Sequence, residues 1–317
     1  MVVTYYFMWP KLVLDPQIRW IILLLCEFLP SLTMSAEFQY DEAFDVTDDV
    51  KRVYDEHGYI LIRGLLDSEE TAHLKKSVEE SDAFTTHSQG VSDGDDRSSK
   101  LAIWRHPGND VTGMVTRCDK VAGFSDKLLG GESYIYHCKL MMKEPLTGGK
   151  FLWHQDYGYW YKNCCLFPDM LSVFLPVDRS VKENGCLEIL EGSHRCGRVE
   201  HLMVGGQTGA DVERVAEIRK KCTHRYVEME PGDALFFHCN LLHSSGINNS
   251  NMRRWVLICA FNKATNNPVY EHEYPQYTKL NKVPNSAIRD CNSNFTDVTG
   301  KNFVDLRKDK TVKVAEQ

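Results

Sequence analysis

The sequence Phe-Leu-Trp-His-Gln-Asp at residues 151–156 constrains the fold and the chemistry of this chain more than any other stretch. Alternate residues of a β-strand share one face, so His154 and Asp156 are predicted to point in the same direction. An imidazole and a carboxylate placed in this way can bind one metal ion together. The His-x-Asp pattern is common by chance, so its interpretation depends on the downstream sequence.

Two further motifs follow at predicted strand boundaries. Pro231-Gly232-Asp233 predicts a turn, and the apolar run that follows it predicts a strand ending at His238. His243 and His238 are competing candidates for a third ligand, and the position of His243 eleven residues before Arg254 favours His243. Two imidazoles and one carboxylate form the 2-His-1-carboxylate triad of non-haem Fe(II) sites. A buried Arg254 offers a planar fork for a carboxylate.

These motifs resemble those of the phytanoyl-CoA dioxygenase family of Fe(II)/2-oxoglutarate oxygenases. The resemblance covers residues 136–261 and rests on four ordered motifs: His154-x-Asp156, Glu183–Leu187 running into Glu191–His194, Pro231–Asp233, and His243 with Arg254. It implies a mainly β fold with flanking helices around a double-stranded β-helix (jelly-roll, cupin-like) core. It also implies hydroxylation of a small-molecule or acyl substrate, with Fe(II) as cofactor, 2-oxoglutarate and O2 as cosubstrates, and release of succinate and CO2.

The resemblance also assigns the cosubstrate contacts. Arg254 is expected to bind the distal carboxylate of 2-oxoglutarate, with the hydroxyl of Ser245 beside it, whereas Arg253 points to the opposite face of the strand. Ser172, on a predicted core strand, is expected to face the same cosubstrate. Lys100 stands near the position of a basic residue that reaches 2-oxoglutarate in related enzymes, and the alternative is a solvated lysine that begins a strand.

Substrate contacts are expected from two regions. Alternation along residues 134–143 puts His137 and Lys139 on one face, and the resemblance implies that this strand lines the pocket. Ectoine hydroxylases of the family tend to carry Arg where this chain has Lys139, which argues against an ectoine-like substrate and leaves a polar or anionic one open. Trp160, in the aromatic run 157–161, matches a substrate-contacting aromatic of those enzymes, and the alternative is packing at the barrel rim.

Composition indicates one globular, intracellular domain. The chain has 317 residues, of which 43% are hydrophobic and 26% charged, which is ordinary for a globular protein. A net charge of -7 argues against nucleic acid as the main partner. The eleven cysteines include no CxxC motif, so reduced thiols in a cytoplasmic protein are expected rather than a disulfide framework.

The chain ends raise the question of targeting. Residues 1–33 are interpreted as a dispensable extension, with membrane anchoring or targeting as the alternative. Their apolar stretch is interrupted by Glu27 and Pro30 and is too short for a stable membrane span. Residues 34–317 are expected to form a single domain, with an insertion at 196–223 acting as a lid. The chain does not end in the Ser-Lys-Leu peroxisomal signal, which disfavours a peroxisomal location without removing that alternative.

Two other classes of protein compete with the oxygenase interpretation. One is a non-catalytic, cupin-like protein that binds a metal or a metabolite, and the complete triad together with Arg254 argues against it. The other is a zinc hydrolase with the same three ligands, since zinc also binds His and carboxylate. That alternative has no positioned general base in the sequence and leaves Arg254 unexplained.

Overall fold

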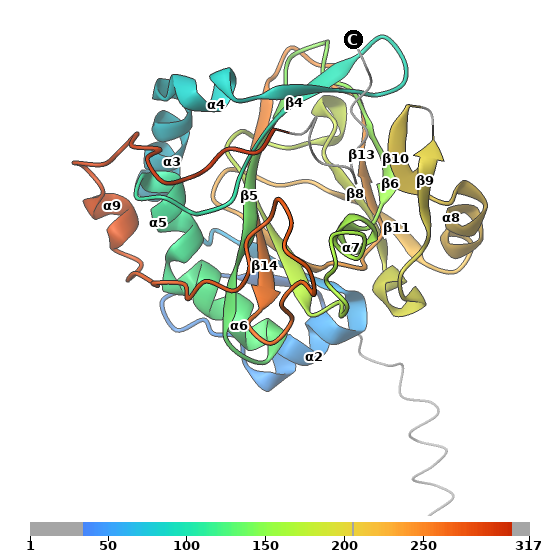
Figure 1. Cartoon of the computed structure of the whole chain (residues 1–317), viewed down its shortest axis with the longest axis horizontal. Helices are drawn as coiled ribbons and strands as arrows, with labels where there is room; N and C mark the ends of the chain where they lie inside the picture. The colour runs from blue at the N-terminus through green and yellow to red at the C-terminus, as the bar shows by residue number, and fades with distance from the viewer. Residues whose placement is uncertain (1–33, 205, 306–317) are drawn as a thin grey trace, which may run out of the picture. The chain divides into compact units, whose positions relative to one another are not determined.

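Two β-sheets form the centre of the structure, a computed structural model that describes residues 34–204 and 206–305 (Figure 1). The predicted extension at residues 1–33 lies outside the described residues. The larger sheet has the spatial strand order β1 (Glu37–Gln39), β2 (Tyr59–Arg63), β12 (Ala234–His238), β7 (Met170–Pro176), β14 (Arg254–Lys263), β5 (Ser133–Lys143), β4 (Ser98–Trp104) and β3 (Gln89–Ser92). All its pairings are antiparallel except β1 with β2.

The smaller sheet faces the larger one and supplies part of the site. Its strand order is β11 (Thr223–Val227), β8 (Leu187–Glu191), β13 (His243–Ser245) and β6 (Phe151–His154). The chain crosses between the sheets, because β12 belongs to the larger sheet and β13 to the smaller one. This arrangement is the double-stranded β-helix expected from the sequence.

The central strands of the larger sheet are buried on both faces. Every residue of β7 is buried, and so are nine of the ten residues of β14. Figure 1 shows why: helices cover the outer face of this sheet, and the smaller sheet covers its inner face. The covering helices include α2 (Asp48–His57), α3 (Ser68–Glu80), α5 (Val111–Arg117) and α6 (Phe124–Leu129). Strands covered on both faces lose the simple alternation of apolar and polar residues.

Local signals account for the helix boundaries. The Thr47 side chain caps α2 by accepting from the Val50 amide, and Asp67 caps α3 through a capping box with Glu70. The sequence predicts one helix over residues 118–129, but the structure has a π-helix at Asp119–Gly123 that leads into α6. Other short helical elements are α4 (Asp82–Thr86), two 3-10 helices (Lys182–Asn184 and Ser193–Cys196) and α9 (Ala287–Asp290).

The predicted insertion is a hairpin followed by a helix. Strands β9 (His201–Val204) and β10 (Gln207–Ala210) pair with each other, and α8 (Val212–Arg219) follows them. These elements pack in a separate apolar cluster composed of Leu190, Val199, Ala210, Val215, Ile218 and Leu242. The insertion is therefore attached to the smaller sheet, and its role as a lid stays a prediction.

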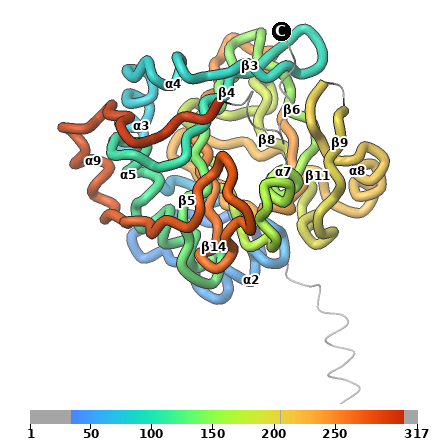
Figure 2. Tube along the Cα trace, viewed as in Figure 1, coloured from blue at the N-terminus to red at the C-terminus, as the bar shows by residue number. Residues whose placement is uncertain are grey.

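The segment after β14 crosses the molecule to the far edge of the larger sheet (Figure 2). The Val304 amide donates to the Ile103 carbonyl at 2.8 Å, and buried Lys301 pairs with buried Asp110.

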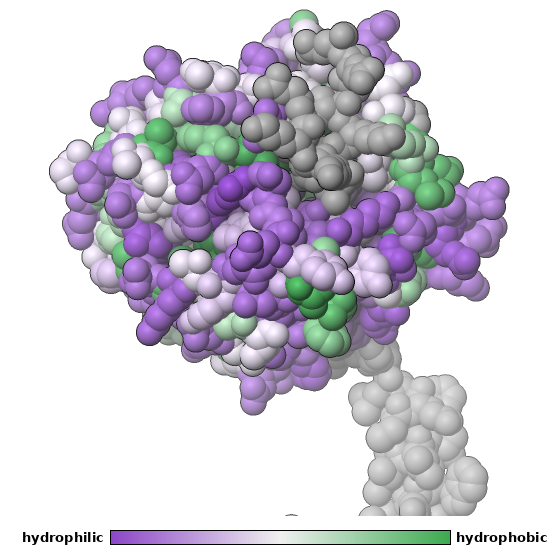
Figure 3. Space-filling model, viewed as in Figure 1, coloured by the Kyte–Doolittle hydropathy of each residue, from purple (hydrophilic) through white to green (hydrophobic). Residues whose placement is uncertain are grey.

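The visible surface is mostly hydrophilic (Figure 3). Within the described part of the chain, no helix is both long and apolar enough to cross a membrane, and the ten cysteines present there are free thiols.

Candidate metal centre and cosubstrate site

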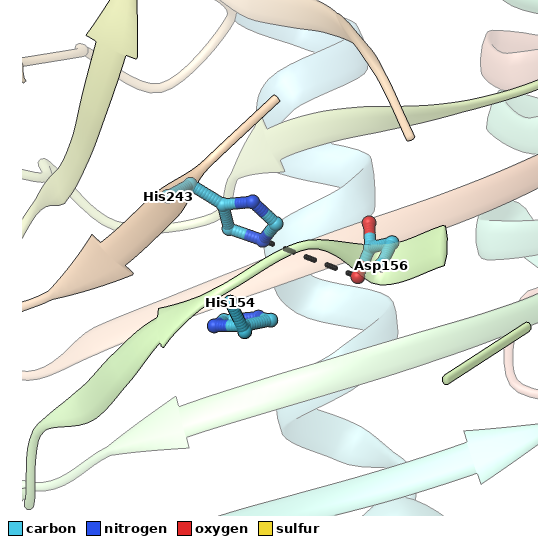
Figure 4. A group of neighbouring side chains, drawn as sticks. All are labelled: His154, Asp156 and His243. Atoms are coloured by element: carbon cyan, nitrogen blue, oxygen red, sulfur yellow. Dashed lines mark ion pairs between the residues drawn. The ribbon is translucent and has the colours of Figure 1, made fainter. Parts of the chain in front are cut away.

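Three side chains from two sheet strands and one helix converge on a common point (Figure 4). Strand β6 ends at His154, and Asp156 begins the short helix α7 (Asp156–Trp160). Gln155 between them keeps an extended backbone, with φ −117° and ψ 136°, so the strand alternation continues as far as Asp156. His243 on β13 pairs with His154 across the smaller sheet. The donor atoms of the three residues all lie within 4.8 Å of one another.

Backbone carbonyls fix the orientation of both imidazoles. The Nδ1 atom of His154 lies 2.6 Å from the Leu152 carbonyl, and Nδ1 of His243 lies 2.9 Å from the Leu241 carbonyl. An N–H at Nδ1 donates to each carbonyl, which leaves Nε2 with a lone pair for a metal. Burial lowers the pKa of both histidines, so the neutral form that a metal requires is favoured.

The two oxygens of the Asp156 carboxylate have different partners. Its Oδ2 accepts a hydrogen bond from the Ser172 hydroxyl at 2.6 Å, and its Oδ1 lies 3.9 Å from Nε2 of His243 and 3.7 Å from Nζ of Lys139. Burial raises the pKa of Asp156, but nearby Lys139, the two imidazoles and the Ser172 hydroxyl outweigh burial and lower it overall. Ser172 thus orients the carboxylate of a candidate ligand, and its expected contact with the cosubstrate stays a prediction.

The residue between the two ligands anchors the whole motif. The buried Gln155 side chain donates to the Gly197 and Asn240 carbonyls at 2.8 and 2.7 Å and accepts from the Val199 amide at 2.7 Å. These bonds join the His-x-Asp motif to the start of the insertion and to the segment before His243. Sequence analysis missed Gln155, because alternation only says that it points away from the metal.

A buried histidine of the insertion adds a further contact. Nε2 of His201 accepts from the Gln155 amide at 2.9 Å, while its Nδ1 lies 2.9 Å from the Val199 carbonyl. The ring occupies the space beside Gly158, where a Cβ would lie 2.1 Å from its nearest atom. Burial lowers the pKa of His201 to about 4, which keeps Nε2 available as an acceptor. The β9–β10 hairpin is thus bonded to the metal motif.

The candidate cosubstrate arginine is fully buried at the start of β14. Its Nε and Nη2 atoms donate to the Gly185 carbonyl at 3.1 and 2.5 Å, and Nη1 lies 3.4 Å from the sulfur of Met141. Among the described residues, no carboxylate pairs with Arg254, and burial lowers its pKa to about 10. Arg253 faces the other way and pairs with Asp178 and Glu79 at 2.8 and 2.6 Å.

A second buried cation, which sequence analysis missed, lies directly across from Arg254. Lys143 ends β5 in register with Arg254, and its Nζ donates to the Ser245 hydroxyl at 2.9 Å and to the Gly246 carbonyl. Burial and the charge of Arg254 hold the pKa of Lys143 well below its usual value. Strand alternation could have identified this residue, because it places Lys143 on the same face of β5 as Lys139.

Lys100 does not belong to this group. Its side chain is exposed on β4, in register with Met142 of β5, whereas Arg254 contacts Met141. Neighbouring residues of a strand point to opposite faces, so Lys100 lies on the face away from Arg254. The expectation that it reaches the cosubstrate is therefore wrong for this structure, and the alternative of a solvated lysine holds.

The structure brings the predicted substrate residues close to one another. The rings of His137 and Trp160 are 5.7 Å apart in an edge-on contact, and Lys139 follows His137 along the same face of β5. Nδ1 of His137 has no hydrogen-bond partner among the described residues, and burial lowers the pKa of His137 to about 3. Their contact with a substrate stays a prediction.

The competing histidine lies elsewhere. His238 ends β12, its Nδ1 accepts from the Asn240 amide at 3.0 Å, and its ring lies 5.3 Å from the ring of His194. Its side chain is absent from the three-residue donor cluster, so the geometry favours His243 over His238. Two imidazoles and one carboxylate on a double-stranded β-helix are the ligand set and fold expected of the non-haem Fe(II)/2-oxoglutarate oxygenases.

Comparisons with known proteins agree with this class. The profile of the phytanoyl-CoA dioxygenase (PhyH) family matches residues 54–256. The L-proline trans-4-hydroxylase of Streptomyces griseoviridis is 30% identical over 195 residues, which cover 56% of this chain and 73% of that protein. An ectoine dioxygenase of Stutzerimonas stutzeri is 24% identical over 229 residues, which cover 67% of this chain and 76% of that protein.

A solved structure shares the fold. EctD from S. alaskensis with bound Fe superimposes with a TM-score of 0.64 and 21% identity, over 77% of this chain and 90% of that one. The chain therefore belongs to the phytanoyl-CoA dioxygenase family. It is an Fe(II)/2-oxoglutarate-dependent dioxygenase, and the fold and enzyme class expected from its sequence are confirmed.

Proposed function

We propose that this enzyme hydroxylates a small polar substrate, with Fe(II) held by His154, Asp156 and His243 and with 2-oxoglutarate held by Arg254 and Ser245. The observation that carries the proposal is the geometry of the three donors, which lie within 4.8 Å of one another. The polar atoms that do not face the common point are already bonded to the protein. This is what a ligand set of fixed geometry requires.

The donor chemistry fits iron. Two neutral imidazoles and one carboxylate leave positions open on Fe(II), as the facial triad of this enzyme class does. When bound, Fe(II) would couple decarboxylation of 2-oxoglutarate to succinate and CO2 with insertion of one oxygen atom of O2 into a substrate C–H bond. The chain itself orients the ligands: the Leu152 and Leu241 carbonyls fix both rings, and Ser172 fixes the carboxylate.

The dicarboxylate fits the buried arginine. Arg254 carries a positive charge into the interior without an acidic partner among the described residues, and buried charges are normally paired. A planar guanidinium can bind a carboxylate through two parallel hydrogen bonds. Ser245 lies at the end of β13, two residues beyond His243, which supports one continuous site from metal to arginine.

The substrate class is inferred from the other side of the metal. Lys139 provides a cation 3.7 Å from Asp156, His137 provides an imidazole nitrogen that is unpaired among the described residues, and Trp160 packs against His137. These groups suit a small molecule with an anionic group and a hydrogen-bond donor. Relatives named for L-proline and ectoine support this choice over an acyl thioester. We also propose a cytoplasmic location, supported by the free thiols.

The test is Fe(II)-dependent and 2-oxoglutarate-dependent succinate release across a library of amino acids, related small acids and acyl thioesters. Stimulation by a small polar acid is expected, and stimulation by acyl thioesters alone would contradict the substrate class. His243→Ala should abolish succinate release, whereas the control His238→Ala should keep most of it. The opposite result for the two variants would show that the third ligand is assigned to the wrong histidine.

A further inference from the structure

Two cysteines stand at the two ends of the insertion. Cys196 is the last residue of a 3-10 helix, and Cys222 immediately precedes β11. Because Thr223 of β11 pairs with Glu191 of β8, Cys222 lies beside the turn that leads into this helix. The segment between the two cysteines contains β9, β10 and α8, which lie together at one side of the molecule (Figure 1). The fold therefore brings the two ends of the insertion together at its base.

The two thiols contact each other, and solvent can reach them. The Cys222 side chain is in hydrogen-bonding contact with the Cys196 side chain, and both line one open surface pocket. Among the ten cysteines of the described residues, Cys196 alone is exposed, Cys164 and Cys222 are half-buried and the others are buried. Cys222 also packs against the apolar cluster of the insertion. This pair thus combines mutual contact with access from solvent.

We propose that Cys196 and Cys222 form a reversible disulfide site at the base of the insertion, with a small disulfide of the glutathione type as the oxidant. Disulfides of cytosolic proteins are usually transient and catalytic or redox-sensing. The pocket suits this oxidant, because it is lined by cations such as Arg198 and Lys221 and by carboxylates such as Glu217. Glutathione itself carries ammonium and carboxylate groups. The inference does not depend on the assignment of the substrate or the cosubstrate.

The reaction should start at the exposed thiol. Burial and the neighbouring Cys196 thiol raise the pKa of Cys222 against the opposing effect of Arg195, so little of Cys222 is the reactive thiolate. The Cys196 thiolate attacks oxidised glutathione, which breaks the S–S bond and releases one reduced glutathione. The Cys222 thiolate then attacks the Cys196 sulfur and displaces the second glutathione. The two thiol protons pass through solvent to the released glutathione molecules, and the two electrons reduce the glutathione disulfide.

The disulfide would fix the insertion next to the metal motif. Gly197 directly follows Cys196, and its carbonyl accepts from the side chain of Gln155, which lies between two candidate metal ligands. The Val199 amide donates to the same glutamine. A covalent bond across the base removes the open conformations in which the two ends of the insertion separate. Oxidation should therefore slow the local opening of β9, β10 and α8.

The experiment incubates the reduced full-length protein in glutathione buffers of increasing oxidised fraction. The remaining thiols are blocked with N-ethylmaleimide in denaturant, and the masses of the intact protein and of its proteolytic peptides are measured. Hydrogen exchange and melting temperature are compared between the reduced and oxidised forms. Cys196→Ser and Cys222→Ser each remove one partner. Cys164→Ser is the matched control, because Cys164 is also partly exposed but does not line the pocket.

The wild type and Cys164→Ser should lose the mass of two hydrogen atoms through a cross-link between Cys196 and Cys222, which dithiothreitol reverses. In the oxidised protein, the amides of β9, β10 and α8 should exchange more slowly, and the melting temperature should rise by roughly 5 °C. Cys222→Ser should stop at the mixed disulfide of Cys196 with glutathione, and Cys196→Ser should form no cross-link.

A wild type that carries glutathione on Cys196 but forms no internal cross-link at any ratio would overturn the inference. A cross-link between two molecules in place of the internal one would also overturn it. Cross-linking that leaves exchange in β9, β10 and α8 unchanged would show that the disulfide does not restrain the insertion. If a serine variant is unstable even when reduced, the cross-link and the exchange rates of the wild type and of Cys164→Ser still decide the result.

Discussion

At the metal end of the site, His154 and His243 bond their Nδ1 atoms to carbonyls and Asp156 accepts from Ser172. At the proposed cosubstrate end, Arg254 and Lys143 are equally buried, and within the described part of the chain their side chains contact only carbonyl, hydroxyl and thioether groups. The first end has its geometry fixed before any ligand arrives. The second end keeps uncompensated charge, which costs stability until an anion binds.

The largest effect on ligand affinity should come from removal of a side chain at the metal end of the site. Asp156→Ala is expected to lower the affinity for Fe(II) or Mn(II) more than about 100-fold, because even the loss of a group that orients a ligand costs 10–100-fold. Metal titration of the purified protein measures this change. His238→Ala is the control, and a comparable loss in that variant would remove the distinction between the two histidines.

The partner of the carboxylate should give the next effect. Ser172→Ala removes the hydrogen bond to Oδ2 of Asp156, and metal affinity should fall roughly 10–100-fold while the fold is kept. Ser125→Ala is a matched control, because Ser125 is also fully buried and its hydroxyl donates to the Val121 carbonyl in a helix, away from the metal site. Equal metal affinities of the two variants would show that the hydrogen bond from Ser172 does not orient Asp156 for metal binding.

Removal of the arginine tests the second end. Arg254→Ala should raise the KM for 2-oxoglutarate by roughly tenfold or more, and Arg254→Lys should raise it less, because an ammonium cannot reproduce the planar fork. Metal affinity should stay within about twofold in both. Arg253→Ala serves as the control, since its ion pairs with Asp178 and Glu79 face away from the site. A KM effect confined to Arg253→Ala would show that the assigned register of β14 is wrong by one residue.

The smallest effect concerns stability and its pH dependence. The folded-state pKa of Lys143 is lowered, so between that value and its ordinary pKa the unfolded chain binds more protons. The stability of the ligand-free enzyme should therefore rise with pH across this window. Lys143→Met should melt a few degrees higher than the wild type near neutral pH, and the difference should shrink toward alkaline pH. A variant that melts lower at every pH would contradict the account of uncompensated charge.

The sequence predicted the fold and the position of the triad, because strand alternation and turn signals are local. His154 and Asp156 are two residues apart, and the alternation continues through Gln155 even though the strand has ended. The prediction that Lys100 reaches the cosubstrate failed for the opposite reason. The face on which Lys100 lies depends on the pairing of β4 with β5, and no local signal in the sequence predicts that pairing.

Other residues could not be assigned without the fold. The partner of Ser172 is Asp156, sixteen residues away at the start of helix α7, and the partners of Gln155 lie in the insertion and before His243. Lys143 and Arg254 become neighbours only through the pairing of β5 with β14. Long-range contacts of this kind decide which of several polar side chains bind a metal or an anion.

The bonds from Gln155 and His201 have a consequence for the evolution and redesign of specificity. A hairpin next to the site would ordinarily be exchangeable between relatives as an independent module. Here the segment from Gly197 to His201 shares hydrogen bonds with the residue between two predicted metal ligands, and Gly158 leaves room for the imidazole. A graft of a foreign hairpin is therefore expected to function only when residues 155 and 158 are transferred with it.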